Sequence, residues 1–130
     1  MKQHVFCYGT LLIRKIRWQL FRKHISTVNA ELPHMQAYQV TGECFPVAKP
    51  KKGKVLQGTL LTLNTKQLNK LDRYEGRMYR RVLCRVRLPD GQTSLAFIYR
   101  PKEQLRISRR EWNIEHFQRR YLRTYLGHMV

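Results

Sequence analysis

The chain has 130 residues, of which 42% are hydrophobic and 26% are charged. These values are typical of one globular domain and exclude a disordered chain. Lysine and arginine number 26 against 8 acidic residues, and the net charge of +18 favours contact with polyanions such as nucleic acid, a ribosomal surface or an anionic membrane.

The sequence shows no membrane or export signal. No apolar run approaches the roughly 20 residues that cross a bilayer, and the opening MKQHVFCYG lacks a long apolar segment with a cleavage site. The three cysteines, Cys7, Cys44 and Cys84, are odd in number and widely spaced, which argues against a disulfide framework. We therefore expect a reducing, cytoplasmic location.

The first predicted elements are a strand, a turn and a helix. Residues 4–8, HVFCY, predict a short buried strand, and Gly9 follows it. Residues 11–25, LLIRKIRWQLFRKHI, predict a helix with a basic back. Its apolar face would comprise Leu12, Ile16, Leu20 and Phe21.

The next segment predicts strands separated by a loop. Residues 27–40 have the composition of a strand that is broken near Pro33. Residues 49–54, KPKKGK, predict a basic loop, and residues 55–63 predict the strand that follows it.

A helix and a hairpin come next. Thr65 is expected to cap a short helix over residues 66–74. Residues 78–88 alternate as a strand does, PDGQ at 89–92 predicts a tight turn, and residues 93–100 return as the partner strand.

The last predicted element is a basic helix over residues 108–126. Ser108 and Glu111 have the spacing of a capping box, and Gly127 would end the helix. Its apolar stripe would comprise Ile114, Phe117, Tyr121 and Tyr125. Together the elements predict one α+β domain over residues 1–130, with a curled sheet or small barrel and flanking helices.

Two acids lie in LDRYEGRMYRR, residues 71–81. Asp72 and Glu75 fall near the C-terminal end of the short helix, where a negative charge opposes the helix dipole. An acid in an unfavourable place hints at function. The alternative is that Glu75 is a solvated loop residue paired with a neighbouring arginine.

The sequence YGTL, Tyr8–Leu11, directly follows the first predicted strand. Consecutive amides at a sharp turn can bind an anion, and Gly9 allows the backbone to approach a ligand closely. The alternative is a plain turn between a strand and a helix.

Several motifs follow one another in a particular order. They are the YGTL turn, FP at 45–46, VLQGTLLTL at 55–63, LDRYEG at 71–76, the DG hairpin and AFIY at 96–99. This set resembles the gamma-glutamylcyclotransferase-like family, particularly its gamma-glutamylamine cyclotransferase-like branch, from about Val5 to Tyr99. The resemblance implies a small mixed β-barrel-like sheet with flanking helices and release of 5-oxoproline from a gamma-glutamyl group.

The resemblance also implies the residues of the site. Glu75 would be the catalytic general acid/base, and no metal or cofactor is implied. The backbone amides of the YGTL turn would hold the glutamyl group. The substrate-binding residues would be Tyr8, Gly9, Thr10, Leu11, Tyr79, Arg81 and Tyr99.

The implied reaction needs little from the protein beyond positioning and proton transfer. The α-amine of the substrate attacks its own γ-carbonyl, and a well-oriented intramolecular attack can be worth ~7–11 kcal/mol. One carboxylate can first accept the ammonium proton and then protonate the leaving amine. Burial among tyrosines would raise the pKa of Glu75 above its usual value of about 4.3 and suit it to this task.

The chain departs from the family pattern in three features. The segment after YGTL is basic and apolar, Phe45 replaces a tyrosine that many members have, and the net charge is unusually high. The five histidines show no HxxxH or HExxH spacing, so no zinc site is expected. A nucleophilic pair of Cys7 and His34 is a further candidate, whereas KPKKGK lacks the spacing of a P-loop.

The alternative function is a non-catalytic or bifunctional basic module that binds nucleic acid or a ribosomal surface. A third possibility is adhesion of the basic helix to an anionic membrane. The sequence leaves the leaving amine and the oligomeric state open. The candidate polyanion-binding residues are Lys49, Lys51, Lys52, Lys54, Arg109, Arg110, Arg119, Arg120 and Arg123.

Overall fold

The structure, a computed structural model, describes residues 2–129. Its strands are β1 (Gln3–Cys7), β2 (Thr27–Val40), β3 (Pro46–Leu63), β4 (Tyr79–Arg87), β5 (Thr93–Pro101) and β6 (Ile107–Glu111). Its helical elements are the 3₁₀ turn η1 (Thr10–Leu12) and the helices α1 (Arg14–Phe21), α2 (Thr65–Glu75), α3 (Ile114–Arg120) and α4 (Leu122–His128).

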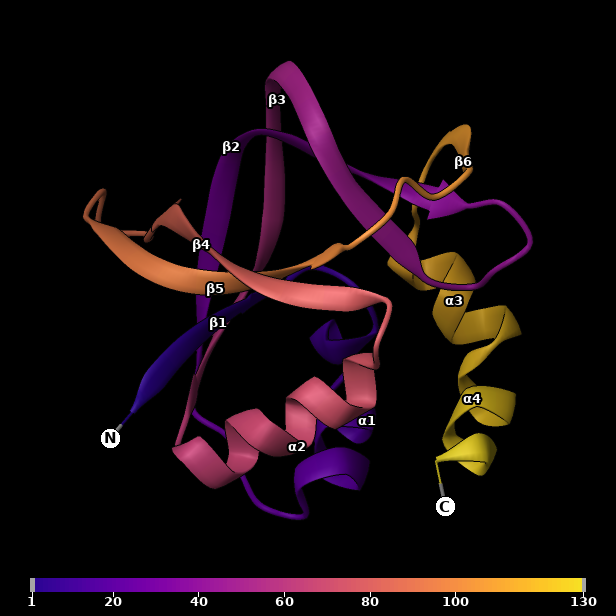
Figure 1. The fold of residues 1–130 in the computed structure, drawn as a ribbon, viewed down its shortest axis with the longest axis horizontal. Coiled ribbons are helices and arrows are strands. Elements are labelled where there is room, and N and C mark those ends of the chain that lie inside the picture. Colours follow the sequence, from indigo (N-terminus) through magenta and orange to yellow (C-terminus); the bar gives the residue numbers. More distant parts are fainter. Residues whose placement is uncertain (1, 130) are drawn as a thin grey trace.

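Five strands close into a barrel in the order β3–β1–β5–β4–β2, with β2 pairing back onto β3 (Figure 1). β1 and β5 run parallel, the other neighbours run antiparallel, and β6 extends the sheet from β2. This arrangement confirms the predicted α+β class with a small mixed barrel and flanking helices.

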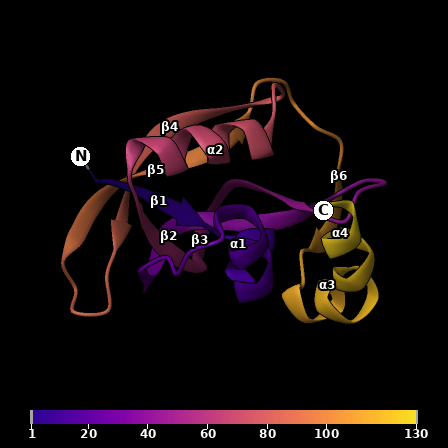
Figure 2. The same cartoon turned by 90° about the horizontal axis from the view of Figure 1, so that it is seen from below.

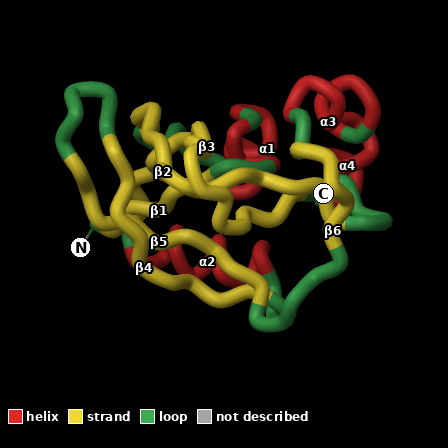
Figure 3. Tube along the Cα trace, turned by 90° about the horizontal axis from the view of Figure 1, so that it is seen from above, coloured by secondary structure: helices red, strands yellow, loops and turns green. Residues whose placement is uncertain are grey.

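The helices gather at one end of the molecule and along one side of the barrel. α3 and α4 lie beside α1, whereas α2 lies beside β4 and β5 (Figure 2). The DG hairpin joins β4 to β5 as predicted and projects away from α3 and α4 (Figure 3). Among the helices of the described chain, none combines the length and apolarity of a membrane-spanning segment.

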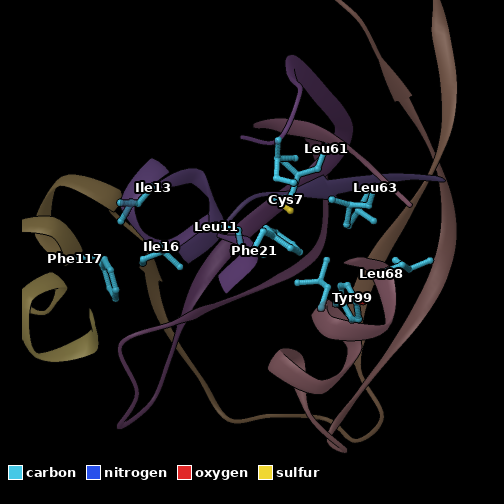
Figure 4. Close-up of a cluster of buried hydrophobic side chains, with 13 residues drawn as sticks. Cys7, Leu11, Ile13, Ile16, Phe21, Leu61, Leu63, Leu68, Tyr99 and Phe117 are labelled. Carbon is cyan, nitrogen blue, oxygen red and sulfur yellow. The ribbon is translucent and has the colours of Figure 1, made fainter. Parts of the chain in front are cut away.

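The second half of β1, Val5–Cys7, is buried on both faces, which explains its apolar run. Phe6 packs into the barrel interior with β2, β3, β4 and β5 residues, whereas Val5 and Cys7 pack against the helices. Figure 4 shows the cluster of buried side chains to which Val5 and Cys7 belong, in which Phe117 of α3 lies next to Ile16 of α1. The core therefore connects the barrel to the C-terminal helices and fixes the end of β1 between them.

The prediction of a basic loop over residues 49–54 is wrong, because this segment belongs to β3. Its pairing with β2 shifts at His34, where residues 51–54 lie opposite that single residue. We call residues 51–54 the lysine bulge. His34 has a φ of 60° and accepts a hydrogen bond from the Gly53 amide at 3.1 Å. β2 and β3 pair with each other both before and after the bulge. The break expected near Pro33 is therefore a local irregularity and does not end the strand.

Asn64, and not Thr65, caps α2. The Asn64 side chain accepts the Gln67 N–H at 2.8 Å, and the Gln67 side chain accepts the Asn64 N–H at 2.9 Å. This reciprocal capping box fixes the start of the helix. The helix ends at Glu75 because Gly76 adopts a φ of 86°, a conformation that favours glycine.

The prediction of one helix over residues 108–126 is also wrong. Residues Ile107–Glu111 form β6, and Glu111 lies opposite Tyr38 of β2. Asn113 is the true helix cap, and the helix is interrupted at Tyr121, which has a φ of −120°. The Ser-x-x-Glu spacing predicted a cap here, but pairing with a distant strand edge determines the structure.

Candidate active site

A cavity of about 410 Å³ opens where β1, α2 and α4 converge. One wall is the turn that follows β1, and another is the C-terminal end of α2. The segment between β2 and β3 and the end of α4 complete it. Seven of the eight predicted site residues line this cavity: Tyr8, Gly9, Thr10, Leu11, Glu75, Tyr79 and Tyr99.

The turn after β1 lines the cavity and contains backbone amides without a partner in the described chain. Within residues 2–129, the N–H groups of Gly9, Thr10 and Leu11 donate to no other group, whereas the carbonyls of Gly9 and Thr10 accept hydrogen bonds of 3.0 and 3.1 Å from the following turn. A Cβ at Gly9 would lie only 3.0 Å from Cγ of Pro46. Glycine therefore allows the turn to pack against Pro46, and its unengaged amides can bind an anionic or carbonyl oxygen.

Tyrosine hydroxyls surround the same cavity. Tyr74 and Tyr125 share a hydrogen bond, and the Tyr74 hydroxyl lies 3.0 Å from Oγ1 of Thr10. The Tyr8 hydroxyl accepts the Ala48 amide N–H at 3.1 Å. Burial raises the pKa of Tyr8 and of Tyr74, so both hydroxyls stay neutral at physiological pH.

Glu75 is one of the two acids that line the cavity, and it ends α2. It is partly buried, and no hydrogen bond or salt bridge to it occurs within residues 2–129. Burial raises the pKa of Glu75 to about 7, and the negative charge of Asp72 adds to the effect. An acid with this pKa can both accept and donate a proton near neutral pH.

Asp72 lies three residues earlier on α2, and its Oδ1 accepts two hydrogen bonds. It accepts a hydrogen bond from the Tyr99 hydroxyl at 2.5 Å and from Nε of Arg81 at 2.8 Å. The Arg81 guanidinium lies over the Phe97 ring, 4.7 Å from its centroid. Arg81 does not line the cavity, so the expected substrate contact is replaced by a contact with Asp72.

Several cavity residues were not predicted from the sequence. Tyr74 directly precedes Glu75 and could have been found from its position. Tyr125 was assigned to the packing stripe of the last helix, and its contact with Tyr74 joins residues 51 positions apart. Glu43 and His128 also line the cavity, and no local motif marks either of them.

The other candidate sites do not form. Burial raises the pKa of Cys7, whereas His34 is exposed at the β2 irregularity, so the predicted nucleophilic pair is wrong. Among residues 2–129, no three histidine, cysteine or acidic side chains gather in a way that could hold a metal ion.

The predicted polyanion-binding residues occupy four different elements. Lys49, Lys51, Lys52 and Lys54 lie on β3, and Arg109 and Arg110 lie on β6. Arg119 and Arg120 end α3, and Arg123 lies on α4. All are exposed except Lys49, which is partly buried. They therefore do not form one patch on one element.

A closed mixed barrel, a turn with free amides and an acid with a raised pKa thus meet at one cavity. The family model described as "Gamma-glutamyl cyclotransferase, AIG2-like" matches residues 5–114, and the chain belongs to this family.

Known proteins of similar sequence and fold agree with this assignment. AIG2-like protein A of Arabidopsis thaliana is 25% identical in an alignment that covers 95% of this chain and 76% of that protein. The solution structure of another Arabidopsis thaliana protein superposes with a TM-score of 0.73 at 22% identity, covering 98% of this chain and 87% of that one. A structure named gamma-glutamyl cyclotransferase gives a TM-score of 0.72 at 16% identity, covering 99% and 86%. These two structures show the shared fold.

Proposed function

We propose that the chain is a gamma-glutamyl cyclotransferase that releases 5-oxoproline from a gamma-glutamylamine or a related small amide. One observation carries the proposal. The carboxyl of Glu75, its pKa raised to about 7, lines the same cavity as the unengaged amides of Gly9, Thr10 and Leu11. This places a proton carrier and an oxygen-binding turn around one space, as the cyclisation requires.

In the first step, the ionised Glu75 accepts a proton from the α-ammonium of the substrate. The freed amine attacks the γ-carbonyl carbon, and a five-membered ring closes through a tetrahedral intermediate. Negative charge develops on the carbonyl oxygen, and the amides of the turn can stabilise it by hydrogen bonding. A pKa of about 7 makes Glu75 a far better base toward an ammonium than an ordinary glutamate is.

In the second step, the protonated Glu75 donates its proton to the departing amine. The bond between the γ-carbon and the amide nitrogen breaks, and the carbonyl re-forms. The ring nitrogen passes its remaining extra proton to the departing amine, so 5-oxoproline and an ammonium ion result. The carboxylate is then ready for another cycle. The substrate supplies both the nucleophile and the leaving group, so the protein provides orientation, proton transfer and stabilisation of charge.

The tyrosines around the cavity support this chemistry by their neutrality. Burial raises the pKa of Tyr79 to about 12, and that of Tyr99 is raised as well. Their hydroxyls therefore add no negative charge beside Glu75. They can orient the substrate through hydrogen bonds without adding charge to the cavity.

The test is release of 5-oxoproline from a panel of gamma-glutamyl compounds that differ in the leaving amine. The parent is expected to release 5-oxoproline from at least one compound, and Glu75→Gln is expected to lose that release. Glu103→Gln, at an exposed acid that does not line the cavity, is the matched control and should act like the parent. No release across the panel, or equal release by Glu75→Gln, rejects the proposal.

A further inference from the structure

The outer face of α2 carries a row of basic side chains. Lys66, Lys70 and Arg73 follow one another at spacings of four and three residues, which place them on one face of the helix. All three are exposed. Since each residue advances a helix by about 1.5 Å, the row extends over roughly 10 Å.

The row continues beyond the end of α2 into a second depression. This depression has a volume of about 750 Å³ and lies beside the candidate active site. Arg73, Arg77, Arg80 and Lys102 line it and are exposed. We call Lys66, Lys70, Arg73, Arg77, Arg80 and Lys102 the α2 basic face.

No acid neutralises the α2 basic face in the part of the chain that the structure describes. Asp72 is the acid among the described residues that line the depression, and Arg81 and Tyr99 already engage it. The salt bridges within residues 2–129 are Arg81–Asp72 and Arg87–Glu31, and neither involves the α2 basic face. These cations are therefore free to contact an external anion.

Two aromatic side chains lie within the same depression. Tyr79 and Phe97 line it and are partly exposed, and the Arg81 guanidinium already lies over the Phe97 ring. A positively charged path with aromatic rings beside it is the arrangement that binds single-stranded nucleic acid, since phosphates contact the cations and bases stack on the rings. A row of roughly 10 Å that continues into a depression exceeds what one small anion needs.

We propose that the α2 basic face and its depression bind a single-stranded nucleic acid through the phosphodiester backbone. α2 lies beside β4 and β5 (Figure 2), and the hydrogen bond that joins it to α4 is made by Tyr74, which does not belong to the α2 basic face. The surface is therefore distinct from the lysine bulge and from the arginines of β6, α3 and α4. It does not depend on the cyclotransferase activity.

The test measures binding of a labelled single-stranded RNA of about 20 nucleotides by fluorescence anisotropy over a salt series. The test variant is Lys70→Gln/Arg73→Gln/Arg77→Gln. The matched control is Lys51→Gln/Lys52→Gln/Lys54→Gln in the lysine bulge, and both variants lower the net charge from +18 by three, to +15. Comparing them separates the position of the charges from their number.

The parent is expected to bind with an affinity that falls steeply with salt. The test variant should bind at least about tenfold more weakly. Its salt slope should be lower by about 2, because each lost phosphate contact on a single strand removes about 0.7 from the slope. The control should change by less than about threefold. Glu75→Gln should bind as the parent does, so binding and cyclotransferase activity are tested separately.

The proposal is overturned by no binding by the parent, by binding that is insensitive to salt, by equal losses in the two triple variants, or by equally tight binding of a nucleoside triphosphate. Tighter binding of a duplex of the same length also overturns it. Thermal unfolding checks that the test variant folds. If it does not, Arg80→Gln/Lys102→Gln on the flanks of the depression replaces it, with at least a threefold loss expected.

Discussion

Asp72 and Glu75 are two acids on the same turn of α2, and their surroundings are opposite. Asp72 faces the basic depression, where Arg81 and Tyr99 both donate to it. Glu75 faces the tyrosine-lined cavity, where no cation or donor engages it within the described residues. Two carboxylates only three positions apart thus differ, because one accepts hydrogen bonds from neighbouring side chains and the other accepts none in the described chain.

The difference shows how one helix end can serve both stability and chemistry. The hydrogen bonds that Asp72 accepts from Arg81 and Tyr99 tie α2 to β4 and β5. An unpaired and partly buried carboxylate is destabilised in its charged form, and this raises its pKa toward neutrality. The negative charge of Asp72 contributes to the same shift, so the first acid helps to tune the second.

The largest expected effect concerns activity. Glu75→Gln should lower kcat/KM for 5-oxoproline release by about 10²–10⁴-fold, because proton transfer by one positioned carboxyl is typically worth that much. Asp72→Asn should lower it by less than tenfold, since Asp72 acts through Tyr99 and Glu75. Steady-state kinetics on the best substrate of the panel measure both. A larger loss in Asp72→Asn than in Glu75→Gln would exchange the roles of the two acids.

The second prediction concerns stability and its dependence on pH. Because the folded state raises the pKa of Glu75 from 4.5 to about 7, it holds a proton that the unfolded chain releases between those values. The free energy of unfolding should therefore fall as pH rises through this window. Glu75→Gln removes the effect and should be more stable than the parent at pH 8, by on the order of 1–2 kcal/mol.

Urea unfolding of both proteins at pH 4 and pH 8 measures this difference. The advantage of Glu75→Gln should be absent at pH 4, where the glutamate is protonated in the folded protein and largely in the unfolded chain. Glu103→Gln, at an exposed position, should show no such dependence. An advantage of Glu75→Gln that is equal at the two pH values contradicts the burial argument.

The third prediction concerns the compensated acid. Arg81→Gln removes the guanidinium that donates to Asp72 and lies over Phe97, so it should cost about 1 kcal/mol of stability at pH 7. The value is low because both side chains of the pair are partly exposed, 28% and 38%. Arg85→Gln, on the same strand with a hydroxyl contact of 3.5 Å, is the control and should change stability by less than about 0.5 kcal/mol. Equal changes in the two variants would show that the pair adds nothing.

The elements that were predicted from the sequence are those with local signals. The Asp-Gly turn, the alternation of β4 and the apolar run of β1 each depend on residues a few positions apart. β6 and the lysine bulge were missed because they depend on pairing with β2, which is far away in the sequence. Neither a Ser-x-x-Glu spacing nor a Lys/Gly-rich segment can show that an edge of β2 is available for pairing.

The same distinction applies to the candidate site. The YGTL turn and Glu75 were predicted because the resemblance to a family assigns them to fixed positions. Tyr125 and His128 come from α4, which packs against α1, and only the folded chain brings them to the cavity. Arg81 was placed in the pocket by its motif, but its strand position directs it to Asp72.

The smallest effect is the most direct test of coupling between the two acids. Asp72→Asn removes a negative charge near Glu75 and keeps an oxygen that can accept a hydrogen bond from the Tyr99 hydroxyl. Because that charge raises the pKa of Glu75, its removal should lower the pKa. The rising limb of kcat/KM against pH, expected near pH 7 in the parent, should move to lower pH by less than one unit.

The shift should be small because burial is the larger cause of the raised pKa and Asp72 the smaller one. Profiles between about pH 5 and pH 9 on one substrate measure it, with Asp90→Asn in the exposed hairpin turn as the control. A limb that stays in place means that the charge of Arg81 already cancels the effect of Asp72 on the pKa of Glu75. A shift above one unit means that charge repulsion, more than burial, sets the pKa of Glu75. A limb that moves to higher pH contradicts the coupling, because the loss of a neighbouring negative charge cannot disfavour an ionised carboxylate.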